Sequence, residues 1–221
     1  MYVPTDADRV AGSAPLRRRQ WTARLLARGL GRIEVIGLER VPRSGGLVLA
    51  VNHRDFLDGP LLFGFLGRPV SFLVKIEAYT PRATPFLNGT GQIAVRRDGM
   101  DVAAVRYCLR LLRAGGVIGV FPEGARGDGL VQTAKPGVGY FALRTGAVVL
   151  PVACHGTDSL KHRRWRRPSV RITVGDPIDL GRTPDGERVT RRQMLTATEQ
   201  VRVALADLVK TTTPHSTQVA A

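Results

Sequence analysis

The sequence predicts an α/β fold, with a mostly parallel central sheet flanked by helices. Short apolar runs with the length of buried strands alternate with longer segments whose apolar residues recur at helical spacing. Turns rich in glycine and proline separate the two kinds of segment. The 221 residues, of which 43% are hydrophobic, are enough for one large domain with a sizeable core.

The N-terminal half begins with residues 1–14, which we expect to be disordered. Residues 15–30 are predicted to be a helix whose leucines and Trp21 lie toward one side and whose arginines lie toward the other. The turn Ser44-Gly45-Gly46 separates the first two strands. Asp58 near the N-cap and Pro60 in the first turn favour the start of the next helix. The strands predicted for the whole chain are 33–36, 47–51, 70–74, 93–95, 117–121, 147–152 and 170–174.

The C-terminal half has clear helix ends. Gly115-Gly116 and Gly146 follow two helical segments and indicate where those helices stop. Residues 175–186 are the one stretch that resembles a linker, and residues 211–221 are expected to form a loose tail. The helices predicted for the whole chain are 15–30, 58–67, 101–113, 136–144 and 190–210.

The chain is strongly basic. Lysine and arginine number 33 against 18 aspartate and glutamate, so the net charge is +15 and the pI is near 11.3. Arg17–Arg19 with Arg24 and Arg28 form one cluster, and residues 161–167 form another around Trp165. Such a field attracts nucleic acid, anionic lipid surfaces or acidic carriers. No nucleic-acid-binding motif is present and only 6% of residues are aromatic, which argues against nucleic acid as the partner.

The cellular compartment can also be inferred. Cys108 and Cys154 are the only cysteines and do not make a disulfide framework, which favours a reducing cytosolic compartment. The first residues do not resemble a signal peptide. No apolar stretch reaches the roughly 20 residues that span a bilayer. We therefore expect a peripheral protein rather than a membrane-spanning one.

The first chemistry-bearing block is Asn52-His53-Arg54-Asp55-Phe56-Leu57-Asp58. It follows a predicted strand, and in α/β sheets functional groups gather where strands end. If the chain folds back, the Asp58 carboxylate can orient the His53 ring and leave its second nitrogen free to take a proton. Alone, the spacing favours a histidine held in a local turn and an aspartate that only caps a helix.

The second block is Phe121-Pro122-Glu123-Gly124-Ala125-Arg126, which also follows a buried strand. Glu123 can accept a substrate hydroxyl or support the histidine, Gly124 permits close backbone approach, and Arg126 can bind a phosphate. Two further cations suit the same role. Arg96 lies at the tip of a strand beside Arg97, and Lys135 precedes a helix N-terminus.

Four blocks occur in order between Asn52 and Val152: Asn-His-x4-Asp, Gly-x-Ile-x-Val-x-Arg, Phe-Pro-Glu-Gly-x-Arg and Val-x-Leu-Pro-Val. Together they resemble the lysophosphatidic acid acyltransferase family, a PlsC-type glycerolipid acyltransferase family. The resemblance implies an acyltransferase domain over residues 31–210. It implies that His53 is the base with Asp58 as its partner, and that Arg96, Glu123, Gly124 and Arg126 bind the anionic acceptor. The sequence departs from the family at Gly127, where members often have serine or threonine, and in having one arginine-rich helix where many have a membrane-embedded hairpin.

The function that follows is transfer of an acyl group from acyl-CoA or acyl-carrier protein to the hydroxyl of a lysophospholipid at the cytoplasmic face of the membrane. The implied partners are the thioester donor, the lysophospholipid and an anionic membrane surface, without a metal or other cofactor. Residues 61–66 and 72–76 are expected to line a tunnel for the acyl chain. A different acceptor (glycerol 3-phosphate, an aminolipid or a glycolipid), a nucleic-acid-binding protein, and a binding module with an inactive site remain as alternatives. The 15–30 helix fits an interfacial role and a core-packing role equally well.

Overall fold

The computed structural model describes residues 14–96, 98–124, 126–162 and 168–213. Within these ranges, seven strands form one sheet in the order β1-β7-β6-β2-β5-β3-β4. The strands are β1 (Arg32–Ile36), β2 (Leu47–Val51), β3 (Val70–Lys75), β4 (Ile93–Val95), β5 (Val117–Val120), β6 (Val148–His155) and β7 (Ser169–Val174). The helices are α1 (Ala14–Leu30), α2 (Asp58–Phe65), α3 (Thr84–Gly89), α4 (Val102–Arg113), α5 (Gly137–Thr145) and α6 (Arg191–Thr212). Short 3-10 turns lie at η2 (Leu38–Arg40), η3 (Ile76–Ala78) and η4 (Asp158–His162).

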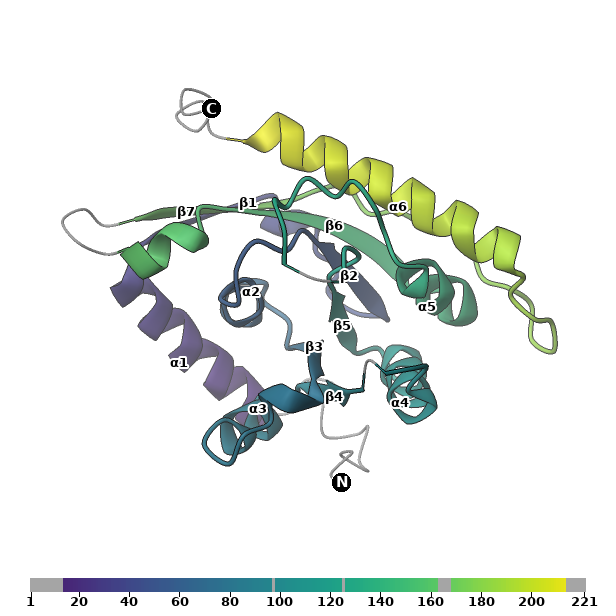
Figure 1. The fold of residues 1–221 in the computed structure, drawn as a ribbon, viewed down its shortest axis with the longest axis horizontal. Helices are drawn as coiled ribbons and strands as arrows, with labels where there is room; N and C mark the ends of the chain where they lie inside the picture. Colours follow the sequence, from purple (N-terminus) through teal and green to yellow (C-terminus); the bar gives the residue numbers. More distant parts are fainter. Residues whose placement is uncertain (1–13, 97, 125, 163–167, 214–221) are drawn as a thin grey trace.

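Neighbouring strands are parallel at every pair except β6–β7. The predicted fold class, a mostly parallel sheet flanked by helices, is confirmed. In Figure 1, α1 and α2 lie on one side of the sheet, and α4, α5 and α6 lie on the other. Residues of β2 alternate between two buried apolar clusters: Val48 and Ala50 belong to one, and Leu47, Leu49 and Val51 to the other. A strand covered on both faces in this way reads as a continuous apolar run.

The β6 strand is longer than its apolar pattern predicts. It continues to His155, because residues 152–155 pair antiparallel with β7. The prediction had also missed α3, a helix of six residues between β3 and β4 that is too short to show helical periodicity. The C-terminal helix begins at a capping box between Thr190 and Gln193 and runs to Thr212, two residues into the expected tail.

The prediction for the α1 helix was wrong about which side chains share a face. Leu16 is buried against the core, whereas Trp21 and Leu25 are exposed together with Arg18 and Arg28. The helix packs along α2, where the backbone of Arg24 approaches Gly64 closely. One side of α1 therefore covers the core, and the opposite side mixes cations with large apolar groups. Residues 1–13 and 214–221, Arg97 and the 163–167 part of the second basic cluster lie outside the described residues.

Candidate active site

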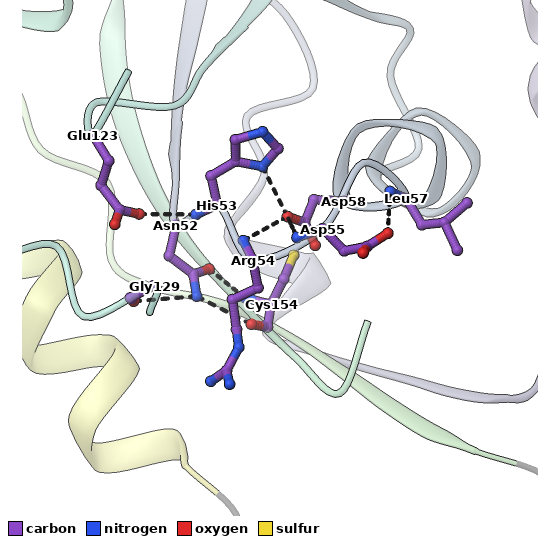
Figure 2. A network of polar contacts seen from close by, with 9 residues as sticks. All are labelled: Asn52, His53, Arg54, Asp55, Leu57, Asp58, Glu123, Gly129 and Cys154. Atoms are coloured by element: carbon purple, nitrogen blue, oxygen red, sulfur yellow. Dashed lines mark hydrogen bonds and ion pairs between the residues drawn. The ribbon is translucent and has the colours of Figure 1, made fainter. Parts of the chain in front are cut away.

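His53 emerges just beyond the end of β2 and is held by Asp58 from the first turn of α2 (Figure 2). The two side chains meet at 3.0 Å between His53 Nδ1 and Asp58 Oδ2. Asp58 is fully buried, while the histidine ring remains partly open to solvent. A carboxylate can only accept, so the ring donates its Nδ1 proton and leaves Nε2 with a lone pair. Figure 2 shows that nitrogen on the side of the ring away from Asp58.

Asp58 lies directly after the N-cap of α2, near the position that the sequence predicted. Leu57 is the N-cap, and the Asp58 carboxylate turns back over the loop before the helix. Its Oδ2 accepts the backbone N–H groups of Arg54 and Asp55, both at 2.9 Å, in addition to the His53 ring. Within the part of the chain that the structure describes, Oδ1 has no hydrogen-bond partner. One oxygen thus fixes both the loop and the imidazole.

The Glu123 block holds the backbone of His53 from the other side. Glu123 Oε1 accepts the His53 backbone N–H at 2.9 Å, and Gly127 donates its N–H to the His53 carbonyl at 3.1 Å. Burial raises the pKa of the Glu123 carboxyl, and the hydrogen bond from His53 partly offsets this. The two blocks, which are 63 positions apart between Asp58 and Phe121, therefore form one structural unit.

An aromatic stack supports the ring of His53. Phe121 lies parallel to it with centroids 3.9 Å apart, and Phe72 of β3 stacks on Phe121 at 5.3 Å. Gly119 of β5 makes room for this arrangement, because a Cβ at that position would lie 2.2 Å from the Phe72 ring. The stack covers one face of the imidazole and helps to hold the ring in its plane.

Asn52 joins the end of β2 to β6. Its Oδ1 accepts the backbone N–H of Cys154 at 2.7 Å, and its Nδ2 donates to the Cys154 carbonyl at 3.1 Å. A longer contact of 3.5 Å reaches the Gly129 carbonyl, also drawn in Figure 2. The side chain is fully buried and continues the ladder where the β2 backbone has ended. Sequence reasoning missed this role, although a polar residue directly after a fully apolar strand is a signal for it.

The predicted acceptor cations lie at the same edge of the sheet. Arg96 follows β4 and is exposed, while its backbone N–H donates to Asp101 Oδ2 at 3.1 Å. Arg126 is exposed beyond Gly124. Lys135 lies over Gly124, whose φ of +73° suits glycine; a Cβ there would be 2.4 Å from Lys135 Cε. The structure therefore brings Lys135 to the Glu123 block and places Arg96 two strands beyond it, across β3.

The segments expected to form an acyl tunnel are mostly packed. Residues 61–66 and Phe72 are buried in the core, whereas Val74 is partly buried and Ile76 is exposed. A hollow of about 440 Å³ between α5, residues 180–184 and the start of α6 includes none of the site residues. Among the described residues, no group of three or more His, Cys, Asp or Glu side chains could hold a metal ion.

Comparison with known proteins decides the family. The family model described as Acyltransferase matches residues 32–155, more than half of the chain. The chain belongs to the acyltransferase family. The matched range contains the His53, Arg96 and Glu123 blocks and ends at His155, the last residue of β6. The prediction of a glycerolipid acyltransferase, and thus of an O-acyltransferase, is confirmed.

Individual relatives of this acyltransferase agree. The 1-acyl-sn-glycerol-3-phosphate acyltransferase of Bacillus subtilis (strain 168) is 26% identical over 164 residues, which cover 72% of this chain and 81% of that protein. The chloroplastic enzyme LPAT1 of Arabidopsis thaliana is 32% identical over 156 residues, 66% of this chain and 44% of the relative. The crystal structure of the 1-acyl-sn-glycerophosphate acyltransferase PlsC from Thermotoga maritima superposes with a TM-score of 0.66 and 26% identity, over 87% of this chain and 79% of that one.

Proposed function

We propose that this acyltransferase moves a fatty acyl group from a thioester, acyl-CoA or acyl-carrier protein, to the free hydroxyl of lysophosphatidic acid, giving phosphatidic acid. The observation that carries the proposal is the 3.0 Å contact between His53 Nδ1 and the buried Asp58. It fixes the tautomer in which Nε2 is the proton acceptor. The names of the relatives support the acceptor, since they are 1-acyl-sn-glycerol-3-phosphate acyltransferases.

In the proposed reaction, His53 Nε2 takes the proton of the acceptor hydroxyl as its oxygen attacks the thioester carbonyl. The new C–O bond forms a tetrahedral intermediate, which collapses with cleavage of the C–S bond. The leaving thiolate takes the proton back from the imidazolium. The Asp58 carboxylate stabilises the imidazolium between these steps. A positioned base of this kind contributes about 10²–10⁴-fold to the rate.

The acceptor's phosphate is proposed to lie against the cations at the sheet edge. Arg96, Arg126 and Lys135 all follow strands of this edge and are exposed. Arginine binds phosphate bidentately, and lysine does so as a point charge. Gly124 permits the close approach, and Glu123 acts chiefly by positioning His53.

A panel experiment tests this function. The purified protein is incubated with acyl-CoA or acyl-carrier protein and with lysophosphatidic acid, glycerol 3-phosphate or other lysolipids, and products are identified by mass spectrometry. We expect phosphatidic acid from lysophosphatidic acid. Arg96→Ala and Arg126→Ala should raise the acceptor KM more than the thioester KM. A larger rise of the thioester KM would indicate that these arginines bind the acyl donor instead. Absence of phosphatidic acid would refute the proposal.

Asp58→Asn offers a sharper test of the mechanism. Because all three donors converge on Oδ2, an amide oxygen in that place can accept all of them, while the negative charge is lost. The variant should therefore fold and lose kcat by about 10²–10⁴-fold. A folded variant with ordinary kcat would show that the carboxylate only anchors the loop.

We also propose peripheral attachment to an anionic membrane at the cytoplasmic face through α1. None of the described helices is long and apolar enough to cross a membrane. The outer side of α1 presents Arg18, Trp21, Leu25 and Arg28. Each cation near an anionic surface contributes about 1 kcal/mol. Trp21→Ser with Leu25→Ser should weaken sedimentation with anionic vesicles. This double variant is preferable to deleting residues 1–30, which would also remove the buried Leu16. Unchanged sedimentation would leave α1 as a core-packing helix.

A further inference from the structure

The edge of the sheet that carries His53 exposes a large apolar side chain after each of four neighbouring strands. The strands β2, β5, β3 and β4 are parallel and so end at one edge. The exposed residues are Phe56 after β2 (56%), Leu130 after β5 (43%), Ile76 after β3 (38%) and Met100 after β4 (82%). At about 4.8 Å between neighbours, the four strand ends span about 15 Å. We call these four residues the strand-end rim.

Cations accompany the rim. Exposed basic side chains occur at the ends of the same strands: Lys75, Arg96, Arg126 and Lys135. Exposed acids in these loops are Glu77, Asp98 and Asp128, so the basic groups outnumber them. Large apolar groups interspersed with an excess of cations are the chemistry of a surface that enters the headgroup layer of an anionic bilayer.

The loops of the rim are held rather than loose. Asp128 Oδ1 accepts the N–H of Leu130 at 2.9 Å. Asp101, next to Met100, accepts the N–H groups of Arg96 and Ala104 at 3.1 Å. The apolar side chains are thus presented on fixed backbone, which lowers the entropy that binding must overcome.

We propose that the strand-end rim is a lipid-binding surface that inserts Ile76, Met100, Leu130 and Phe56 into an anionic bilayer, so that the active-site edge itself faces the membrane. This rests on the proposed function, since the acceptor resides in a bilayer, but it goes beyond attachment through α1. His53 would then lie at headgroup level, where a lysolipid hydroxyl reaches it with little extraction of the acyl chain from the lipid.

Matched controls exist on the same molecule. Ile36 and Val203 are both 42% exposed, close to the 43% of Leu130 and the 38% of Ile76. Ile36 ends β1, which runs antiparallel to β2 and therefore ends at the opposite edge. Val203 lies on α6. Because these two control residues are exposed but lie elsewhere, they distinguish insertion at the rim from nonspecific binding of any exposed apolar side chain to vesicles.

The first experiment reports depth directly. The two native cysteines are fully buried, so an environment-sensitive fluorophore can be attached selectively to Met100→Cys, Leu130→Cys, Ile36→Cys or Val203→Cys. Vesicles of mixed phosphatidylglycerol and phosphatidylcholine are then added. We expect a blue shift and protection from aqueous quenchers at positions 100 and 130, and neither effect at positions 36 and 203.

The second experiment measures affinity. Met100→Ser with Leu130→Ser should lower the vesicle partition coefficient by about tenfold or more, given the free energy of burying apolar surface. Ile36→Ser with Val203→Ser should leave it within about twofold. On a water-soluble, short-chain acceptor the Met100→Ser, Leu130→Ser variant should keep wild-type turnover, while turnover of a vesicle-embedded acceptor falls with the binding.

Several outcomes would overturn the inference. The first is unchanged fluorescence of the labels at positions 100 and 130 on protein that is bound to vesicles. The others are an equal fluorescence shift at the control positions and the absence of vesicle binding. A shift that depends on protein concentration without lipid would identify a second copy of the chain as the occupant, and a shift with acyl-carrier protein alone would identify the donor. Absence of activity on the soluble acceptor in the wild-type protein would instead refute the proposed function. The two failures can be distinguished because the label experiment needs no turnover.

Discussion

Glu123 Oε1 accepts the backbone N–H of His53 at 2.9 Å, so a direct hydrogen bond joins the two sequence blocks. The blocks are therefore connected even without the substrate that both are proposed to bind. The contact fixes the peptide from which the proposed base projects. Gly127 holds the carbonyl of the same residue. Glu123 is therefore a positioning residue in the proposed mechanism.

Glu123→Gln and Glu123→Ala should separate this role from substrate binding. The glutamine oxygen can still accept the His53 N–H, so kcat should stay within about tenfold of wild type. Alanine removes the acceptor, and the displacement of His53 should lower kcat by about 10²-fold with little change in the acceptor KM. Steady-state kinetics on a soluble acceptor measure this; a rise of acceptor KM at constant kcat would assign Glu123 to the substrate.

Asn52→Ala should destabilise the protein. It leaves the buried N–H and carbonyl of Cys154 unpaired, which should lower the free energy of unfolding by about 2–4 kcal/mol. Gln132→Ala, at an exposed amide, is the control and should change it by less than about 0.5 kcal/mol. Urea unfolding at equal concentrations provides the comparison, and equal midpoints for both variants would contradict the role of Asn52.

Gly119→Ala should disturb the aromatic stack. Its Cβ would meet the Phe72 ring at 2.2 Å, so Phe72 and then Phe121 must shift. We expect a loss of about 1–3 kcal/mol of stability and a fall in kcat, since the His53 ring loses its support. Gly99→Ala, where nothing lies within 4 Å of the new Cβ, should have neither effect. If the Gly119 variant keeps full activity, the stack is only core packing.

His155 predicts a specific pH dependence of stability. Burial, followed by the charges of Arg54 and Arg171, lowers the pKa of this histidine from its usual 6.5. The unfolded chain therefore binds a proton at higher pH than the folded one, and stability is lost as the pH falls below about 6.5. His155→Gln can still pair with Thr212 and does not titrate. Its melting temperature should fall less than that of wild type between about pH 7.5 and 5.5; parallel curves would be inconsistent with this.

The sequence predicted the strands and most helices because each is a separate apolar segment with its own stop signal. The β2 strand, buried on both faces, and the α4 helix, with Asp101 as its N-cap, are examples. Three features were not predicted, two because they depend on distant partners and one because the element is short. The extension of β6 needs the antiparallel β7, the split faces of α1 follow from its contact with α2, and α3 is too short to show a period.

At the site, the sequence placed His53 and the Glu123 block at one edge because both follow parallel strands. Local spacing could not distinguish a capping Asp58 from one that turns back to His53, since that depends on the path of residues 54–57. The contacts of Asn52 with Cys154 and of Phe121 with Phe72 join residues far apart in sequence. Only the polar residue after β2 and the glycine inside β5 hinted at them.

The proposed role of His53 as general base can be measured through the rate of acyl transfer in His53→Ala. The assay uses acyl-CoA with a short-chain, water-soluble lysophosphatidic acid, so that membrane binding does not enter, and His155→Gln is the histidine control. We expect a variant that still folds and has a kcat lower by about 10²–10⁴-fold. A folded His53→Ala variant that turns over within about tenfold of wild type would contradict it.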